Sequence, residues 1–241
     1  MSTTNIFTSS FHEQDPRWSA VDAYTLSHLH PPSRPNHASL THALENSRVK
    51  GLPDISSYPA MAKFFALQCR MGGVKHALEI GTLGGYTSIW LATMNPEMKV
   101  TTLEIDPVHA EVARQNLAEA GVADRVNVIV GPALDAMSGL HAEIERGDKP
   151  PFGFVFIDAD KENNWTYFDL AVKMSAPRAC VFVDNVVVKG NLVSPEAQGD
   201  EMVQGARQVI EEVGRDKRVE AVVLQTVCEK SYDGVLMAVV L

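Results

Sequence analysis

The chain has 241 residues, 45% of them apolar, and a formal net charge of −9. That length and apolar content suffice for one substantial hydrophobic core, so we expect a single α/β domain with a short extension. An acidic chain without a run of Lys or Arg is not expected to bind nucleic acid or an anionic membrane. This favours a small molecule as the main partner.

The cysteines and the hydropathy pattern indicate the compartment. The three cysteines are far apart, odd in number and without metal-type spacing, so neither a disulfide framework nor a zinc site is expected. The N-terminus is polar, and no apolar run approaches the ~18 to 20 residues that a membrane span requires. We therefore expect a cytoplasmic protein that is neither secreted nor inserted in a membrane.

We interpret residues 1–55 as an N-terminal arm. Its Pro-rich stretch, 31–35, would interrupt a helix. Most histidines of the arm are expected to be solvated, because they share no metal-type spacing with a carboxylate. The residues considered are His28, His30, His37 and His42. We expect the arm to cover the active site or to pack on a second subunit.

Residues 56–241 carry the pattern of an α/β domain. Short apolar runs alternate with amphipathic stretches, which predicts right-handed crossovers and a mostly parallel sheet with helices on both faces. Only a loop separates the last two strands, so they form a hairpin and one terminal strand is antiparallel. The seven expected strands are 76–80, 99–105, 125–130, 153–157, 178–183, 218–226 and 234–241. The expected helices are 58–71, 86–94, 107–120, 133–145, 163–175 and 200–214.

A glycine-rich turn, residues 81–85, joins the first strand to the next helix. Its glycines let the backbone approach a ligand at the helix N-terminus, although such a turn can also bind nothing. Glu79 and Glu104 end the first two strands, where an acid accepts hydrogen bonds from ribose hydroxyls. A carboxylate at Glu79 would repel a pyrophosphate, so a cationic nucleoside such as S-adenosylmethionine fits better than a dinucleotide. Alternatively, Glu104 is a solvated strand end, and Asp106 competes for its role.

Acidic residues also follow the fourth and fifth strands. Asp158 emerges from one and Asp184-Asn185 from the other, so these oxygens are expected to converge at the carboxyl ends of neighbouring parallel strands. Such hard donors suit Mg²⁺ or a similar divalent cation. Without a cation, the carboxylates would raise each other's pKa. The alternative is structural, with Asp160 capping a helix and Asp184-Asn185 forming a turn.

Lys161 is the predicted catalytic base. It follows Asp158 by three residues, and a nearby cation with partial desolvation would lower its pKa toward neutrality, so that it could accept a phenolic proton. The alternative is a plain ion pair with Asp160 or Glu162, with the metal alone acidifying the phenol.

Residues 52–241 resemble the metal-dependent O-methyltransferases that include caffeoyl-CoA and catechol O-methyltransferases. Six segments of the chain match that family and occur in the same order. The resemblance implies a Rossmann-like methyltransferase fold, a homodimer, and direct methyl transfer from S-adenosylmethionine to one oxygen of a small vicinal-diol phenol. The segments are Glu79-Ile80-Gly81-Thr82 with Gly84-Gly85-Tyr86-Thr87-Ser88, Leu103-Glu104-Ile105-Asp106, Gly131-Pro132-Ala133-Leu134, Phe156-Ile157-Asp158-Ala159-Asp160-Lys161, Val183-Asp184-Asn185 and Tyr232-Asp233-Gly234.

The resemblance also implies roles for individual residues. It assigns the metal to Asp158, Asp184 and Asn185, with Mg²⁺ favoured and Ca²⁺ or Mn²⁺ as alternatives, and it assigns Lys161 and Asp158 to catalysis. The residues implied to line the cofactor pocket are Glu79, Gly81, Ser88, Glu104, Ala133 and Asp158.

The chain departs from the family on the acceptor side. The plant enzymes carry a Trp shortly after the Asp-Asn pair, where this chain has residues 186–190, and their Asp-Lys segment continues into Asn-Tyr, where this chain has Asn163-Asn164. The acceptor therefore cannot be transferred from the family, and few basic residues are present for the nucleotide tail of caffeoyl-CoA. Trp165 and Tyr167 fit the core better than an acceptor pocket, and the loop 189–199 is expected to border that pocket.

Two other functions compete with this interpretation. A non-catalytic protein that binds S-adenosylmethionine would not need the acidic trio. An NAD-dependent oxidoreductase would need a pyrophosphate-compatible GxGxxG and a Tyr-x-x-x-Lys pair, which the sequence lacks.

Overall fold

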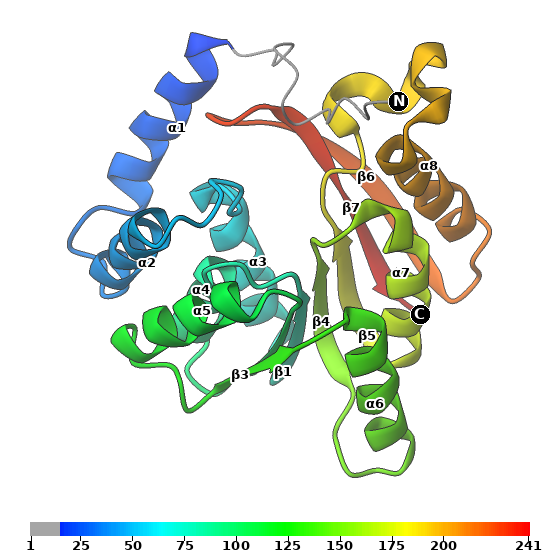
Figure 1. The fold of residues 1–241 in the computed structure, drawn as a ribbon, viewed down its shortest axis with the longest axis horizontal. Helices are drawn as coiled ribbons and strands as arrows, with labels where there is room; N and C mark the ends of the chain where they lie inside the picture. The colour runs from blue at the N-terminus through cyan, green and yellow to red at the C-terminus, as the bar shows by residue number, and fades with distance from the viewer. Residues whose placement is uncertain (1–14) are drawn as a thin grey trace.

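The computed structural model describes residues 15–241, which contain a seven-stranded sheet with helices on both faces (Figure 1). The strands are β1 (His76–Ile80), β2 (Lys99–Glu104), β3 (Val126–Val130), β4 (Phe152–Ile157), β5 (Ser175–Val183), β6 (Val219–Val227) and β7 (Tyr232–Val240). Their order across the sheet is β3-β2-β1-β4-β5-β7-β6. After β3 the chain returns to the other side of β1 to form β4, so the strand order reverses between β1 and β4. Ligands bind beside such a switch point in open α/β sheets.

β7, the last strand in the sequence, is antiparallel to the other strands of the sheet. β7 pairs antiparallel with β5 on one side and with β6 on the other, whereas β1 to β5 pair in parallel. The hairpin of β6 and β7 explains this arrangement, because a short connection can only join antiparallel neighbours. The predicted fold, a mostly parallel seven-stranded sheet with one antiparallel C-terminal strand, is confirmed.

The helices form two layers. α2, α3, α4 and α5 cover one face, and α6, α7 and α8 cover the other (Figure 1). Because both faces are covered, a central strand can be buried on both sides, and β4 buries Phe154, Val155, Phe156 and Ile157. The domain helices are α3 (Pro59–Gly72), α4 (Tyr86–Met94), α5 (Pro107–Glu119), α6 (Ala133–Glu145), α7 (Asn164–Lys173) and α8 (Glu201–Val213).

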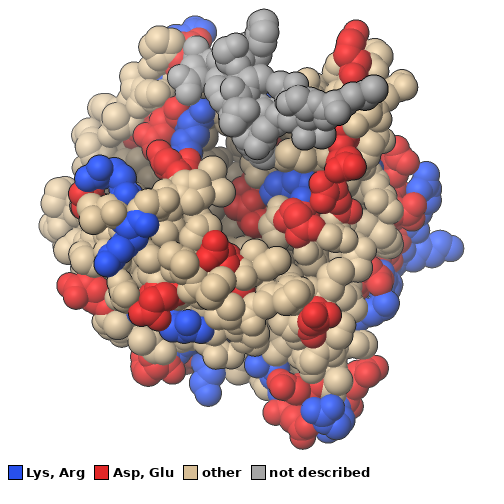
Figure 2. Space-filling model, in the orientation of Figure 1, with Lys and Arg blue, Asp and Glu red and all other residues tan. Residues whose placement is uncertain are grey.

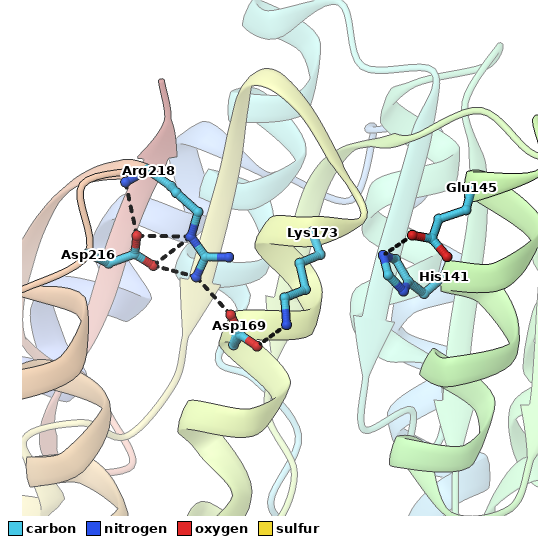
Figure 3. Close-up of polar contacts among 6 residues, drawn as sticks. All are labelled: His141, Glu145, Asp169, Lys173, Asp216 and Arg218. Carbon is cyan, nitrogen blue, oxygen red and sulfur yellow. Dashed lines mark hydrogen bonds and ion pairs between the residues drawn. The ribbon is translucent and has the colours of Figure 1, made fainter.

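One polar network fastens α7 to the start of β6. Arg218 donates to Asp216, and its Nη2 lies 2.8 Å from Oδ1 of Asp169 on α7, which also accepts from Lys173 (Figure 3). The guanidinium holds the pKa of Asp216 below its usual range through that hydrogen bond. This network orients the chain as it turns from α8 into the hairpin.

The N-terminal arm contains two helices, α1 (Pro16–Leu29) and α2 (His37–Val49), which the Pro-rich stretch separates. α2 buries Leu40 and Ala43 in the same core cluster as α3 and α4, so this part of the arm packs directly on the domain. His30 is also buried, with its ring 4.5 Å from that of Trp90, so the expectation that the histidines are solvated is wrong for this residue. The predicted boundary at residue 55, between the N-terminal arm and the methyltransferase-like domain, stays a prediction.

The arm also touches the tip of the β6–β7 hairpin. The amide of Glu229 donates to Asp22 of α1 at 2.9 Å, and Lys230 donates to Asp54 and to the carbonyl of Ser56, both at 2.9 Å. On the face drawn in Figure 2, a hollow near the middle is bordered by acidic and basic side chains. Within residues 15–241, no helix combines the length and apolar character needed to cross a membrane.

Candidate active site

Three loops meet at the carboxyl edge of the sheet. Strand register aligns Ile80 with Ile157 and Ile157 with Val183, so the residues that follow β1, β4 and β5 leave the sheet side by side. The amide of Asp158 donates to the carbonyl of Ile80 at 2.8 Å, and the amide of Asp184 donates to the carbonyl of Ile157 at 2.9 Å. The glycine-rich turn and the acidic residues therefore leave the sheet at the same edge, from neighbouring strands.

Gly81 makes the closest approach between these loops possible. Its φ is +97°, and a Cβ there would lie 2.0 Å from the carbonyl oxygen of Asp158. Any other residue would combine a disfavoured backbone conformation with a collision against backbone. The glycine-rich turn thus lies directly on the chain that carries Asp158.

Glu79 is a buried carboxylate beneath the turn. It accepts hydrogen bonds from the hydroxyl of Ser88 on α4 and, at 2.8 Å, from Oγ1 of Thr102 on β2. Burial raises the pKa of Glu79 to about 7, although these two hydrogen bonds lower it in part. Two of the predicted cofactor residues, Glu79 and Ser88, are therefore in direct contact in a site that disfavours an uncompensated negative charge.

Glu104 faces the turn, whereas its competitor Asp106 does not. Oε2 of Glu104 accepts from the amides of Thr82 and Leu83 at 3.2 and 2.7 Å. Asp106 caps α5, accepting from the amide of Val108 at 2.7 Å. Glu104 is thus the acid available at the end of β2, and Asp106 has a helix-capping role.

Ala133 lies at the same edge of the sheet. It begins α6 directly after β3, and the amide of Gly131 donates to the carbonyl of Glu104 at 2.9 Å. This bond places the chain leading to Ala133 beside the end of β2, next to Glu104.

Lys161 forms an ion pair with Asp158. Its Nζ lies 2.8 Å from Oδ1 of that residue, and only 6% of its side chain is exposed. The ion pair considered as the alternative to catalysis is therefore present, but with Asp158 in place of Asp160 or Glu162. Asp160 instead accepts from the hydroxyl of Tyr167 at 2.5 Å and makes no helix-capping hydrogen bond.

The pKa of Lys161 is set in the structure by burial and by the carboxylates around it, and the lowering expected from a bound cation stays a prediction. Burial lowers it, but the carboxylates of Asp158, Asp184 and Asp233 outweigh burial and raise the pKa above its ordinary value. The reason is the local charge balance, with three carboxylates around one ammonium group. Burial and the neighbouring Asp158 likewise raise the pKa of Asp184.

Asp233, at the start of β7, is a site residue to which the sequence analysis gave no role. Its Oδ1 accepts from the amides of Val187, Val188 and Gly234 at 3.2, 3.0 and 2.8 Å. Its Oδ2 lies 3.5 Å from Nδ2 of Asn185, which has a φ of +57°. One carboxylate therefore holds the loop that follows β5. The sequence signal that could have indicated a role for Asp233 is its place in the family-matching segment Tyr232-Asp233-Gly234.

The chain around Lys161 is held by α8. A Cβ at Gly205 would lie 2.1 Å from the carbonyl oxygen of Lys161, so the helix backbone packs directly on residues 161–163. Trp165 and Tyr167 belong to the hydrophobic core, as expected. The loop 189–199 contains two short 3₁₀ segments, Val188–Val193 and Pro195–Gly199, rather than an irregular connection.

Comparison with known proteins identifies the family. The family model described as O-methyltransferase matches residues 32–238. The chain belongs to the O-methyltransferase family. This methyltransferase is 59% identical over 239 residues to the O-methyltransferase imqG of Aspergillus flavus, with 99% of this chain and 97% of that protein covered. It is 40% identical to a catechol O-methyltransferase of Mycobacterium tuberculosis, with 95% and 98% covered.

A solved structure agrees with the fold and the cofactor. The O-methyltransferase from Bacillus cereus in complex with SAH matches the methyltransferase with a TM-score of 0.85 and 41% identity, over 93% of this chain and 99% of that one. The methyltransferase is an S-adenosylmethionine-dependent enzyme with a Rossmann-like fold. The interpretation as an NAD-dependent oxidoreductase is thereby excluded, and so is that of a non-catalytic binding protein.

Proposed function

We propose that this enzyme transfers the methyl group of S-adenosylmethionine to one hydroxyl of a small catechol-type acceptor, with the assistance of a divalent cation. The observation that carries the proposal is the convergence of Asp158, Asp184 and Lys161, with Asp158 directly against Gly81 of the glycine-rich turn. A vicinal diol is the acceptor that presents two oxygens to one cation. Relatives named catechol O-methyltransferase support this acceptor class.

The proposed site for S-adenosylmethionine is formed by Glu79, Gly81, Ser88, Glu104, Ala133 and Asp158. Glu104 already accepts two hydrogen bonds from the turn, at Thr82 and Leu83, and its carboxylate has the hydrogen-bonding capacity to accept from ribose hydroxyls. Glu79 is buried, and among residues 15–241 it forms no ion pair with a basic side chain. The positive charge of the cofactor fits this environment, because it offsets the cost of ionising a buried carboxylate.

The proposed cation ligands are Asp158, Asp184 and Asn185. Among residues 15–241, no group of three His, Cys, Asp or Glu side chains is arranged to hold a metal ion, so the amide oxygen of Asn185 must complete the set. The Nδ2 of Asn185 is directed toward Asp233, which leaves its Oδ1 to bind a cation. An all-oxygen set fits Mg²⁺, and Ca²⁺ or Mn²⁺ would also be accepted.

The charge of the cluster supports this assignment. Burial raises the pKa of Asp184 most, the charge of Asp158 raises it further, and Lys161 offsets these effects only in part. When bound, the cation supplies positive charge that lowers the pKa of the acceptor hydroxyls and of Lys161. Lys161 is then the group that takes the phenolic proton at Nζ, while the half-buried Asp158 keeps that nitrogen in place.

The test uses mass spectrometry of products formed from catechol and from resorcinol, with Mg²⁺ or with EDTA. We expect methylation of catechol with Mg²⁺, almost none with EDTA, and little of resorcinol, whose hydroxyls are not vicinal. Lys161→Met should reduce kcat by about 10²- to 10⁴-fold. Lys173→Met, which removes a lysine on the outside of α7, is the matched control. Full transfer in EDTA would refute the metal role, and equal methylation of resorcinol would refute the diol requirement.

Two further assignments accompany the proposal. The exposed apolar residues of α1, Val21, Tyr24 and Leu29, support a homodimer in which the arm packs on a second copy. Sedimentation of the wild-type protein compared with a Tyr24→Asp variant tests this assignment.

The three cysteines are free thiols in the structure, which supports a reducing cytoplasmic environment.

A further inference from the structure

A buried asparagine joins the N-terminal arm to the glycine-rich turn. Asn116 on α5 has no exposed surface. Its Nδ2 donates to the carbonyl of Gly84 at 2.8 Å, and its Oδ1 accepts from Nδ2 of Asn46 on α2 at 2.8 Å. One amide group thus bonds to the proposed cofactor turn with its nitrogen and to the arm with its oxygen.

The same nitrogen makes two longer contacts with α2. It lies 3.3 Å from Oγ of Ser47 and 3.4 Å from the carbonyl of Ala43. The hydroxyl of Ser47 itself donates to that carbonyl at 2.7 Å. Because Asn116 is shielded from water, any movement of α2 away from the turn would leave these polar atoms without partners.

Ser47 also fills the space beside Gly84. A Cβ at Gly84 would lie 2.1 Å from Oγ and 3.2 Å from Cβ of Ser47. Gly84 has no positive φ, so its lack of a side chain is explained by this contact rather than by the backbone conformation. The turn and α2 therefore meet through two independent features, a hydrogen-bond network and a close steric contact.

We propose that Asn116 is a positioning residue for the cofactor site and that, through it, α2 is energetically coupled to S-adenosylmethionine binding. Asn116 holds the carbonyl of Gly84, and this fixes the turn whose amides at Thr82 and Leu83 contact Glu104. Because coupling between two sites is reciprocal, cofactor binding stabilises α2 in return. The inference rests on the placement of the cofactor at this turn under the proposed function.

The first measurement is the dissociation constant of S-adenosylhomocysteine for the full-length protein, by calorimetry. We expect Asn116→Ala to weaken binding about tenfold, the effect of one buried hydrogen bond. Asn46→Ala, which removes only the bond from the arm, should weaken it about threefold. The matched control is Gln115→Ala, which removes an exposed bond to Glu111 from the same helix and should leave the constant unchanged.

The second measurement is hydrogen exchange of the wild-type protein with and without S-adenosylhomocysteine. We expect slower exchange in α2 and in the turn, no change in β6, and loss of the α2 effect in Asn46→Ala. Wild-type affinity in both Asn116→Ala and Asn46→Ala would overturn the proposal. So would unchanged exchange in α2 while the turn is protected. If the ligand protects neither the turn nor α2, the cofactor placement itself is wrong. If Asn116→Ala does not fold, Asn46→Ala and the exchange of the wild-type protein decide.

Discussion

Gly81 lies so close to Asp158 that a Cβ added at this glycine would be 2.0 Å from the carbonyl oxygen of Asp158. The turn assigned to the cofactor and the strand end assigned to the metal are therefore in backbone contact, and neither can move without the other. The two halves of the proposed reaction, the methyl donor and the activated oxygen, are held at a fixed separation by this contact.

Gly81→Ala tests that contact. We expect a loss of at least about 3 kcal/mol in the free energy of unfolding, because backbone must shift to admit the methyl group. Binding of S-adenosylhomocysteine should be lost as well. Gly121→Ala is the control, since its φ of +67° carries the same kind of backbone cost in open space, about 1 kcal/mol. Denaturant unfolding and calorimetry measure both quantities. Equal effects of the two substitutions would show that the contact is unimportant.

Asp233→Ala tests the carboxylate that holds the loop after β5. Three backbone amides lose their acceptor, so we expect unfolding to become easier by about 2 to 4 kcal/mol. Affinity for Mn²⁺, measured by electron paramagnetic resonance, should fall about tenfold, while S-adenosylhomocysteine binds normally. Asp216→Ala also removes an acceptor of a backbone amide, far from the site, and should lower stability alone. A variant of Asp233 with unchanged Mn²⁺ affinity would contradict the positioning role.

The buried carboxyl of Glu79 should make stability depend on pH. Its pKa is raised from 4.5 to about 7, so the folded protein binds the proton more tightly than the unfolded chain. This stabilisation is fully present below pH 4.5 and is lost as the pH rises through 7, by an amount on the order of 3 kcal/mol. Glu79→Gln should remove this slope, as measured by denaturant unfolding between pH 4.5 and 7.5. A parallel curve for the variant would refute the assignment.

His30 should produce the opposite slope. Burial, with the neighbouring Lys63, His37 and Arg34, lowers its pKa from 6.5 to about 4, so protonation favours the unfolded chain. Stability is therefore full above pH 6.5 and falls as the pH drops toward 4, by roughly 1 to 3 kcal/mol. Its buried Nε2 has no hydrogen-bond partner within the part of the chain that the structure describes. His30→Phe should therefore keep the packing on Trp90 and be more stable than the wild type at pH 5.

The slopes of Glu79 and His30 oppose each other between pH 4.5 and 6.5. The wild-type curve in that window contains both contributions, so the difference between the wild type and each single variant separates them. If His30→Phe follows the wild-type curve at every pH, the shielding of His30 from protons is disproved.

The sheet and the order of site residues could be predicted from the sequence because local patterns carry that information. Continuous apolar runs mark strands covered on both faces, such as β4, and residues directly after them must lie at the carboxyl edge. These runs alone place Asp158 and Asp184 near each other, and the hairpin at the C-terminus indicates the antiparallel strand.

The remaining features depend on contacts between distant segments, which local patterns do not encode. Asn116 lies in an ordinary amphipathic helix, and nothing near it indicates that α2 lies against it. The carboxylates that raise the pKa of Lys161 are those of Asp158, Asp184 and, with a smaller effect, Asp233, which is 72 positions later in the sequence. The burial of His30 against Trp90 is likewise a property of the assembled fold.

The position of β7 between β5 and β6 has a consequence for synthesis on the ribosome. β1 to β5 emerge early and can pair in parallel, but β6 has no neighbour in the sheet until β7 has been made. The loop after Asp184 obtains its acceptor, Asp233, only from that final strand. The proposed cofactor residues of β1 and β2 are thus synthesised well before Asp233, the carboxylate that holds the proposed metal-binding loop.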